Sequence, residues 1–203
     1  MRFLPQLFEH NRAWASRQTG RDPLFFQRLC AIQRPDHLWI GCADSRVPAN
    51  EIVDLAPGEL FVHRNIANLV PPDDPNCLSV LQYAVDVLEV GHVIVCGHYR
   101  CGGVQAAFGP PGAQPLEGWI APIRRLCHAR REELAGLPDP EARWRRLCEW
   151  NVAAQVRTLR ALPTVTAAWA RGRKLALHGW IYDLRDGLLK DLQVSVDGPP
   201  PVT

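Results

Sequence analysis

Two short segments of the chain carry cysteine and histidine at a spacing that suits a metal ion. Cys42 follows one apolar run, and His98 and Cys101 lie three residues apart just after another. Two thiolates and an imidazole are the donors that a borderline-soft cation such as Zn²⁺ prefers. Three protein ligands without an evident fourth are the stoichiometry of a catalytic zinc, which keeps one position open for water.

A carboxylate and a guanidinium lie close to the first of these cysteines. Asp44 and Arg46 follow Cys42 by two and four residues. A zinc ion at this position would make zinc-bound hydroxide beside an ion pair. The simpler interpretation of Asp44 and Arg46 is a surface ion pair that contributes little.

The sequence also allows other interpretations of the same thiols. A closed structural zinc site needs a fourth ligand, for which Cys96 and His63 are the nearest candidates, but neither belongs to a paired-ligand motif. A phosphatase-like thiolate loop at Cys101 fails, because it would need an arginine where the chain has Ala107. A pair of buried thiols with a core histidine needs no metal at all.

Apolar runs bounded by turn residues predict the strands that position these groups. The first four runs lack strict alternation, as expected for parallel strands covered on both faces. A fifth run alternates and follows a turn at Asp186–Gly187, so we expect it to pair antiparallel with the fourth. The five predicted strands are His37–Gly41, Leu60–His63, His92–Cys96, Leu175–Tyr182 and Lys190–Val196.

Helical periodicity fills the intervals between these strands. It extends over Cys77–Val90, and Asp139 with Pro140 predicts the start of a helix that runs to about Leu162. The alternation predicts an α/β fold, a mostly parallel four-stranded sheet with an antiparallel fifth edge strand, flanked by helices. Sites in such sheets form at the carboxyl ends of strands, where Cys42 and His98 are placed.

Length and composition indicate one ordinary globular domain. The 203 residues contain no compositional boundary, so we expect a single domain 1–203 with a helical arm over 1–35 and a flexible tail over 197–203. The net charge is only +2, and the arginines alternate with acidic residues, which disfavours a nucleic-acid partner. No apolar run of about 20 residues predicts a membrane span. The absence of a signal-peptide pattern and the odd number of cysteines favour reduced thiols in the cytoplasm.

Several segments that recur in order resemble the β-class carbonic anhydrases. The similarity extends from Trp39 to Val196, nearly the whole chain. The resemblance implies a zinc lyase that interconverts CO₂ and bicarbonate, with one Zn²⁺ per subunit on Cys42, His98 and Cys101. The matching segments are Cys42–Pro48, Phe61–Asn68, Asn76–Ala84, His98–Gly103 and His178–Asp183.

The resemblance also implies roles for the residues around the metal. Asp44, held by Arg46, would stay ionised and accept a hydrogen bond from zinc-bound water, which aims the resulting hydroxide at CO₂. The same carboxylate could instead move onto zinc and switch the enzyme off. The amides of Gly102 and Gly103 could bind a substrate oxygen, although a plain helix start explains these glycines equally well. The substrate pocket would be lined, in part from a neighbouring subunit, by Gln33, Phe61, Ile66 and Tyr83.

A subgroup of this family carries a regulatory bicarbonate site, and its residues have counterparts here. Trp39, Arg64 and Tyr182 would form that site, with the guanidinium binding the anion. Without the resemblance, the two aromatic residues would be taken as core residues. Asn50 is a departure, because an acidic residue is associated with this position in the subgroup.

The resemblance implies an assembly, and two other functions compete with the leading one. A homodimer or homotetramer is expected, since sites of the family lie at a dimer interface. The same zinc site could hydrolyse CS₂ or COS. A non-catalytic, zinc-stabilised oligomerisation module would need the thiols but neither Asp44 nor Arg46, and both are present.

Overall fold

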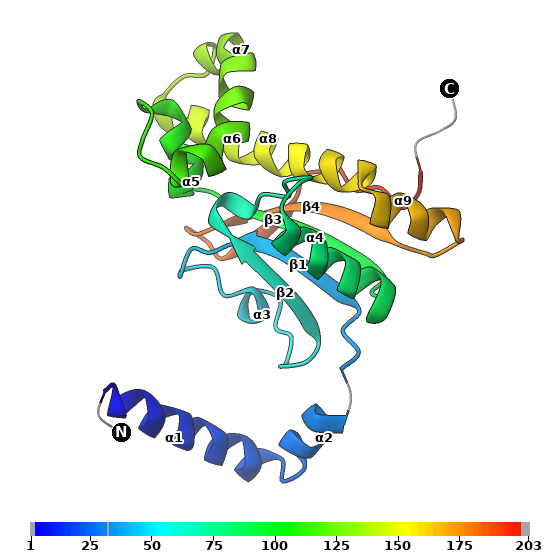
Figure 1. Ribbon diagram of the computed structural model, residues 1–203. Coiled ribbons are helices and arrows are strands. Elements are labelled where there is room, and N and C mark those ends of the chain that lie inside the picture. The colour runs from blue at the N-terminus through cyan, green and yellow to red at the C-terminus, as the bar shows by residue number, and fades with distance from the viewer. Residues whose placement is uncertain (1–2, 32, 200–203) are drawn as a thin grey trace. The chain divides into compact units, whose positions relative to one another are not determined.

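The computed structural model describes residues 3–31 and 33–199 (Figure 1). The chain separates into two compact units, Met1–Arg34 and Pro35–Thr203, and each is described by itself. The single domain with an arm over 1–35 stays a prediction, as does the tail over 197–203, of which residues 200–203 lie outside the described residues.

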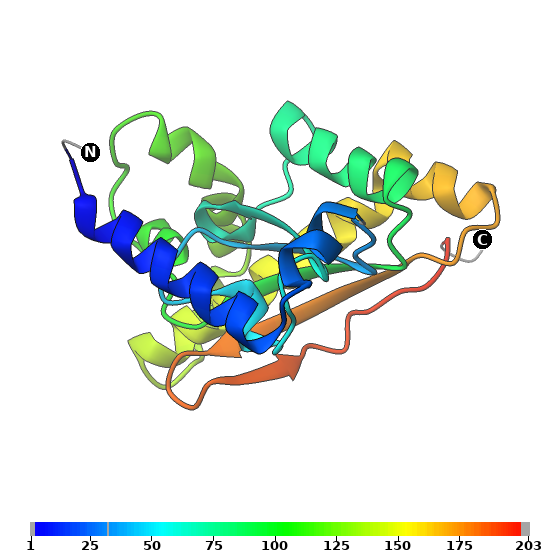
Figure 2. The same ribbon diagram turned by 90° about the horizontal axis from the view of Figure 1, so that it is seen from below.

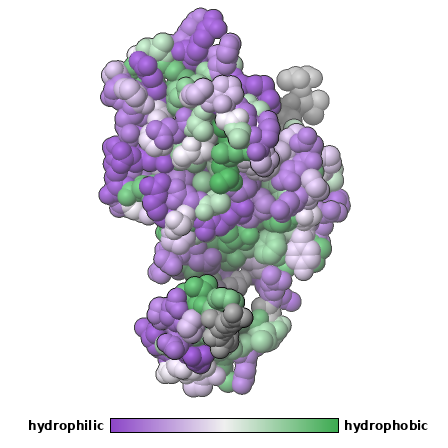
Figure 3. Space-filling model, turned by 60° about the vertical axis from the view of Figure 1, so that its left-hand side comes forward, coloured by the Kyte–Doolittle hydropathy of each residue, from purple (hydrophilic) through white to green (hydrophobic). Residues whose placement is uncertain are grey.

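The first unit consists of two helices, α1 (Pro5–Arg21) and α2 (Phe25–Ala31). Trp14 packs edge-on against Phe25 and Phe26, with ring centroids 6.4 and 5.7 Å away. Neither helix buries a residue. Figure 3 shows hydrophobic side chains at the surface of both units; the most exposed of the first unit are Phe3, Leu4, Leu7, Phe8 and Leu24.

The second unit is built on a five-stranded sheet of order β2-β1-β3-β4-β5. The first four strands are parallel and β5 is antiparallel to β4, and Figure 2 shows β5 along the outer side of β4. The predicted fold class is therefore confirmed. The strands are β1 (His37–Cys42), β2 (Leu60–Asn65), β3 (His92–His98), β4 (Ala176–Asp183) and β5 (Leu188–Asp191).

Helices cover both faces of this sheet, because successive strand residues point to opposite sides. Leu38 and Ile40 of β1 pack with α4, α8 and α9, whereas Trp39 packs with α3 on the other face. Figure 1 shows α4 and α3 on the two sides of the sheet. Three short helical turns lie between the larger elements: η1 (Ile66–Asn68), the π-turn η2 (Tyr83–Val87) and η3 (Ala106–Phe108). The helices are α3 (Ala49–Ile52), α4 (Pro75–Gln82), α5 (Gly102–Gln105), α6 (Leu116–Ala129), α7 (Arg131–Ala135), α8 (Pro140–Ala161) and α9 (Pro163–Ala170).

The predicted start of the long helix is confirmed. The Asp139 carboxylate accepts a hydrogen bond from the Ala142 amide at 2.7 Å, and Pro140 occupies the first turn, where a missing amide proton costs nothing. The helix α8 ends at Ala161, just before the Leu162-Pro163 pair. Its buried residues face the sheet, which places α8 directly behind β3 and β4.

The four parallel strands end one or two residues later than predicted, and two other elements differ more. The last strand covers Leu188–Asp191 rather than Lys190–Val196. The carboxylate of Asp191 accepts the Gln193 amide at 2.8 Å, and Gln193 has a φ of 57°, so the chain leaves the sheet there and returns only as a single bridge at Val196. The helix expected over Cys77–Val90 starts earlier, at Pro75, and changes to the π-turn at Tyr83.

Among the described residues, no helix combines the length and apolar character that crossing a bilayer requires.

Candidate metal centre

The three predicted metal ligands meet at the carboxyl edge of the sheet. Cys42 is the last residue of β1 and His98 the last residue of β3, and these strands are hydrogen-bonded neighbours. Cys101 lies just before α5. The two sulfur atoms are 3.9 Å apart, and the sulfur and imidazole ligand atoms all lie within 4.8 Å of one another. All three residues are at most 4% exposed, so the donors converge in a site screened from bulk water.

The imidazole of His98 is oriented for coordination. Its Nδ1 lies 2.9 Å from the carbonyl oxygen of Tyr99 and donates to it, which leaves the Nε2 lone pair free. This Nε2 is buried and has no hydrogen-bond partner among residues 3–31 and 33–199. A buried polar atom without a partner is costly, and a cation bound between it and the sulfurs would satisfy it.

The charge balance of the two thiols also fits a divalent cation. The two sulfurs share one hydrogen bond, which either thiol can donate, and this interaction lowers the pKa of Cys42 and raises the pKa of Cys101. Burial raises both, so two adjacent thiolates are unfavourable on their own. A Zn²⁺ ion removes that conflict, because it compensates both negative charges. Neither Cys96 nor His63 belongs to the cluster in the described part of the chain, so no fourth ligand comes from the predicted candidates.

Asp44 and Arg46 form a two-point ion pair beside the cluster. Arg46 donates from Nε to Oδ1 at 2.9 Å and from Nη2 to Oδ2 at 2.7 Å, and its backbone amide donates to Oδ1 at 2.9 Å. These bonds hold the pKa of Asp44 well below its ordinary value. The Oδ2 atom lies 3.8 Å from His98 Nε2. An ionised carboxylate therefore stands next to the position that the three ligands surround.

The three residues of the predicted bicarbonate site lie on one face of the sheet. Trp39 is 1% exposed, and it belongs with Tyr182 to the apolar cluster under α3. Arg64, on β2, donates from Nε to the Cys42 carbonyl at 2.8 Å and from Nη2 to the Asp44 carbonyl at 2.5 Å. Its guanidinium thus ties the strand β2 to the loop that carries the ion pair. Asn50, on α3, donates from its side chain to the carbonyls of Leu55 and Ala56 in the segment that follows the helix.

The predicted substrate-lining residues are only partly brought together. The aromatic rings of Phe61 and Tyr83 contact each other, with their centroids 5.8 Å apart. Ile66, which is 41% exposed, lies against Gly103. Gln33 belongs to the first unit, so its distance from the other residues is not defined.

Comparison with known proteins identifies the family. A carbonic anhydrase family model matches residues 37–189. A carbonic anhydrase of Emericella nidulans is 47% identical over 193 residues, which are 95% of this chain and 85% of the relative. The chain belongs to the β-carbonic anhydrase family. The family likeness extends to the fold: the Coccomyxa β-carbonic anhydrase in complex with acetazolamide superposes with a TM-score of 0.91 at 41% identity, covering 98% of this chain and 90% of that one.

A second solved structure adds the β-carbonic anhydrases of Sordaria macrospora, described as tetrameric. One of them has a TM-score of 0.88 and 38% identity, and the match covers 94% of this chain and 97% of that one. The enzyme class of this chain is therefore carbonic anhydrase.

Two polar residues of α8 support the carbonic anhydrase site and were missed in the sequence. Asn151 donates to the Ala67 carbonyl at 2.9 Å, and Gln155 accepts from the Val70 amide at 2.9 Å while donating to Asn151 at 3.0 Å. They hold the turn after β2, in which Ala67 has a φ of 65°. A backbone hydrogen bond from Ala67 lowers the pKa of Cys42. The signal was a pair of amides four residues apart on an otherwise apolar helix face.

Replacing Asn151 by Ala is expected to lower the free energy of unfolding by about 1–3 kcal/mol, because the Ala67 carbonyl and the Gln155 amide lose their partner in a buried site. Urea denaturation of the purified protein measures this loss. Arg157→Ala is the matched control, since Arg157 is an exposed residue of the same helix and should change stability by less than about 0.5 kcal/mol. Equal stability of the two variants would contradict the buried network.

The adjacent glycines Gly102 and Gly103 offer a direct test of packing at the site. A Cβ atom at Gly103 would lie 2.7 Å from Ile66 Cγ2 and 3.2 Å from Ala67 Cβ, whereas one at Gly102 would meet nothing within 4 Å. Gly103→Ala is therefore expected to displace the turn beside the metal ligands and to lower kcat/KM for CO₂ by roughly 10-fold or more. Gly102→Ala retains the backbone amide and meets no neighbouring atom, so it should keep the parent rate, and stopped-flow CO₂ hydration compares the two variants. A Gly103→Ala enzyme as active as Gly102→Ala would show that this contact is not needed.

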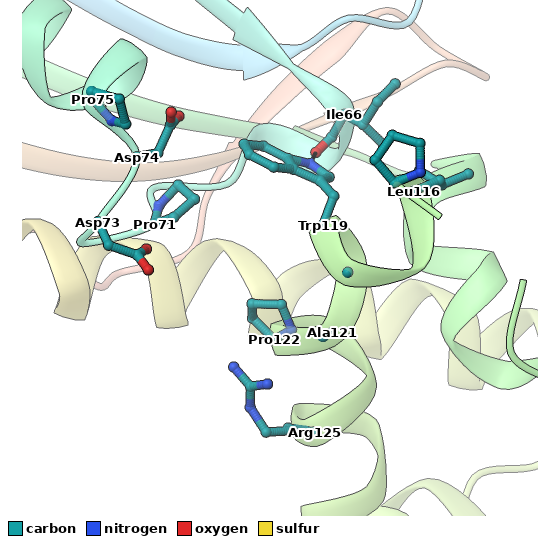
Figure 4. A pocket seen from close by; sticks show the side chains of 12 residues that line it. Ile66, Pro71, Asp73, Asp74, Pro75, Leu116, Trp119, Ala121, Pro122 and Arg125 are labelled. Atoms are coloured by element: carbon teal, nitrogen blue, oxygen red, sulfur yellow. Dashed lines mark hydrogen bonds between the residues drawn. The ribbon is translucent and has the colours of Figure 1, made fainter. Parts of the chain in front are cut away.

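A pocket of about 760 Å³ adjoins this region (Figure 4). The indole Nε1 of Trp119 donates to the Ile66 carbonyl at 2.8 Å, so α6 also fixes the turn after β2. None of the three candidate metal ligands lines the pocket, and Ile66 alone among the predicted substrate-lining residues does. The pocket is lined by Ile66, Pro71, Asp73, Asp74, Pro75, Pro115, Leu116, Gly118, Trp119, Ala121, Pro122 and Arg125.

Proposed function

We propose that this β-carbonic anhydrase hydrates CO₂ reversibly to bicarbonate and a proton, with one Zn²⁺ per subunit held by Cys42, His98 and Cys101. The observation that carries the proposal is the convergence of two buried sulfurs on a buried imidazole nitrogen that has no hydrogen-bond partner in the described part of the chain. When bound, Zn²⁺ supplies Lewis acidity that makes water nucleophilic near neutral pH.

Asp44 and Arg46 would orient the nucleophile. Because Arg46 keeps it ionised, Asp44 can only accept hydrogen bonds. Its Oδ2, 3.8 Å from His98 Nε2, would accept a hydrogen bond from the attacking oxygen and so direct a lone pair of that oxygen toward CO₂. Two side-chain bonds and one backbone bond to Arg46 resist movement of this carboxylate toward the metal. The paired arrangement therefore supports the active form.

The substrate would bind near the turn after β2, where Ile66 lies beside Gly103. Phe61 and Tyr83 contact each other nearer the amino end of β2, so a neighbouring subunit would supply these two side chains to the pocket. CO₂ carries no net charge and little polarity, so an apolar lining excludes competing water without binding bicarbonate strongly. The backbone amides of Gly102 and Gly103 would donate hydrogen bonds to a substrate oxygen.

Zinc content and stopped-flow CO₂ hydration of the purified full chain test this function together. One zinc per chain with rapid hydration is the expected result. A protein with zinc but no turnover would instead fit the non-catalytic oligomerisation module, and a protein that prefers COS or CS₂ would fit the alternative hydrolase. A metal-free protein would contradict the proposed ligand set.

We propose a regulatory bicarbonate site at Trp39, Arg64 and Tyr182. An anion bound to Arg64 would compete with its bonds to the carbonyls of Cys42 and Asp44. Loosening the loop in this way would favour movement of Asp44 onto the metal, because the anion binds that state better.

Trp39→Phe tests the site, since it keeps a buried ring but removes the indole N–H. Added bicarbonate should inhibit the parent in steady-state assays near neutral pH and inhibit the variant several-fold less. Identical inhibition of the parent and the variant by bicarbonate would contradict the proposed regulatory site.

The assembly would be a homodimer or homotetramer. Support comes from the tetrameric Sordaria macrospora relatives and from the exposed apolar side chains of α1, among them Leu7 and Phe8. An active monomer in sedimentation experiments would contradict this. Seven unpaired thiols support a cytoplasmic location.

A further inference from the structure

A second cluster of metal-binding side chains lies at the opposite edge of the same sheet. His37 and His92 are the first residues of β1 and β3 and are partners in the strand register. Their imidazoles stack at 5.3 Å with an angle of 17° between the ring planes. Asp36 Oδ2 lies 3.9 Å from the Nε2 atom of each histidine. One ligand atom from each residue lies within 4.8 Å of the other two.

His178, on β4, fixes the orientation of His92. His92 Nδ1 lies 3.0 Å from His178 Nε2, and His178 Nδ1 lies 3.2 Å from Ser195 Oγ. All these atoms are satisfied when His178 donates to Ser195 and accepts the Nδ1 proton of His92. The Nε2 lone pair of His92 is then directed to the space beside Asp36. Protein metal sites orient their histidine ligands through such a second-nitrogen hydrogen bond.

The backbone and a neighbouring glycine position the carboxylate. The Asp36 carbonyl accepts hydrogen bonds from the amides of Gly91 and His92 at 3.0 and 3.1 Å, which attaches Asp36 to the start of β3. A Cβ atom at Gly91 would lie 3.0 Å from Asp36 Oδ1, so the missing side chain leaves room for the carboxylate. The side chain of Asp36 is 67% exposed and that of His92 41%, so an ion can reach them from solvent.

The donor set of this cluster indicates the kind of ion that it fits. A carboxylate with two imidazoles matches first-row divalent ions of the zinc and nickel type, whereas magnesium and calcium select sites made of oxygen alone.

We propose that Asp36, His37 and His92 form a second binding site for a divalent transition-metal ion, with His178 as a positioning residue. The ion would join β1 to β3 at their amino ends. The site shares no residue with the catalytic centre, so the proposed second site can be tested independently of the proposed function.

The experiment uses the full zinc-loaded chain without an affinity tag and Ni²⁺ as the probe. We expect one Ni²⁺ per chain in addition to the catalytic zinc, measured by calorimetric titration and by metal analysis after gel filtration. His92→Asn and, as a second variant, His37→Asn should each weaken Ni²⁺ binding by at least about 10-fold. His128→Asn is the control, because His128 lies on α6 outside the cluster.

Two further variants complete the test. His178→Phe removes no ligand but releases His92, so it should weaken Ni²⁺ binding by about 10–100-fold, a loss that an uninvolved histidine would not cause. Cys42→Ser should lose zinc yet bind Ni²⁺ at the second site as the parent does. A parent that takes up no extra Ni²⁺, or His92→Asn and His37→Asn proteins that bind it as tightly as the parent, would overturn the proposal.

Discussion

Asp44→Asn is expected to lower kcat/KM for CO₂ hydration by about 10²–10⁴-fold at unchanged zinc content. The amide keeps the size of the side chain but loses the charge that binds Arg46 at two points. Its nitrogen, placed near His98 Nε2, would present a donor where the reaction needs an acceptor. Stopped-flow hydration assays with metal analysis of the same samples measure both quantities.

The matched control is Asp86→Asn. Asp86 also pairs with an arginine, Arg171, at 2.7 Å, but this half-exposed pair joins η2 to the end of α9 and does not belong to the metal-ligand cluster. Its replacement should leave kcat/KM within about 2-fold of the parent. Two variants with equal, near-parental rates would mean that Asp44 and Arg46 are only a surface ion pair.

The pKa of Asp44 sets the direction of the pH dependence. Because Arg46 lowers it below the ordinary value, the carboxylate stays ionised as the pH falls through the range in which free aspartate takes up a proton. Its pairing contributes stability that is present above the ordinary pKa and lost only below the folded-state pKa. A loss of activity between neutral and mildly acidic pH would therefore result from the titration of groups other than Asp44.

Cys101→Ala is expected to abolish zinc binding and, with it, measurable CO₂ hydration. The variant leaves one sulfur and one imidazole, and the remaining Cys42 loses the hydrogen bond that lowers its pKa. Metal analysis after dialysis should fall from one zinc per chain toward zero. A metal chelator should reproduce the inactive state with the parent protein.

Cys127→Ala is the control for loss of a thiol. Cys127 lies on α6, is half-buried, and does not belong to the metal-ligand cluster. Zinc content and activity should match the parent. Full zinc retention by Cys101→Ala would contradict the ligand set and reopen the interpretation of the thiols as core residues.

The fold and the ligand cluster were predictable because their signals are local. Apolar runs marked four parallel strands, and Asp139 with Pro140 marked the start of α8. Since carboxyl ends of parallel strands share one edge, Cys42 and His98 were expected to meet, and the structure brings them together. The roles of Asp44, Arg46 and the bicarbonate residues stay predictions.

The remainder depends on contacts between distant segments. The end of β5 is set by the turn at Gln193, which no composition signal announced. Asn151 reaches the turn after β2 only because α8 packs across the sheet. The arrangement of His37 beside His92 follows from the strand register, which a single sequence does not specify.

The pairing of β1 with β3 places one candidate metal site at each end of the same two strands. In this ladder Gly41 pairs with Cys96 and His37 with His92. A slip of one residue would turn every side chain of β1 to the other face, scattering both donor sets at once. Loss of both zinc and nickel binding in one variant would therefore indicate that β1 and β3 pair in the wrong register. Replacement of a single ligand should instead abolish binding of one ion and leave binding of the other unchanged.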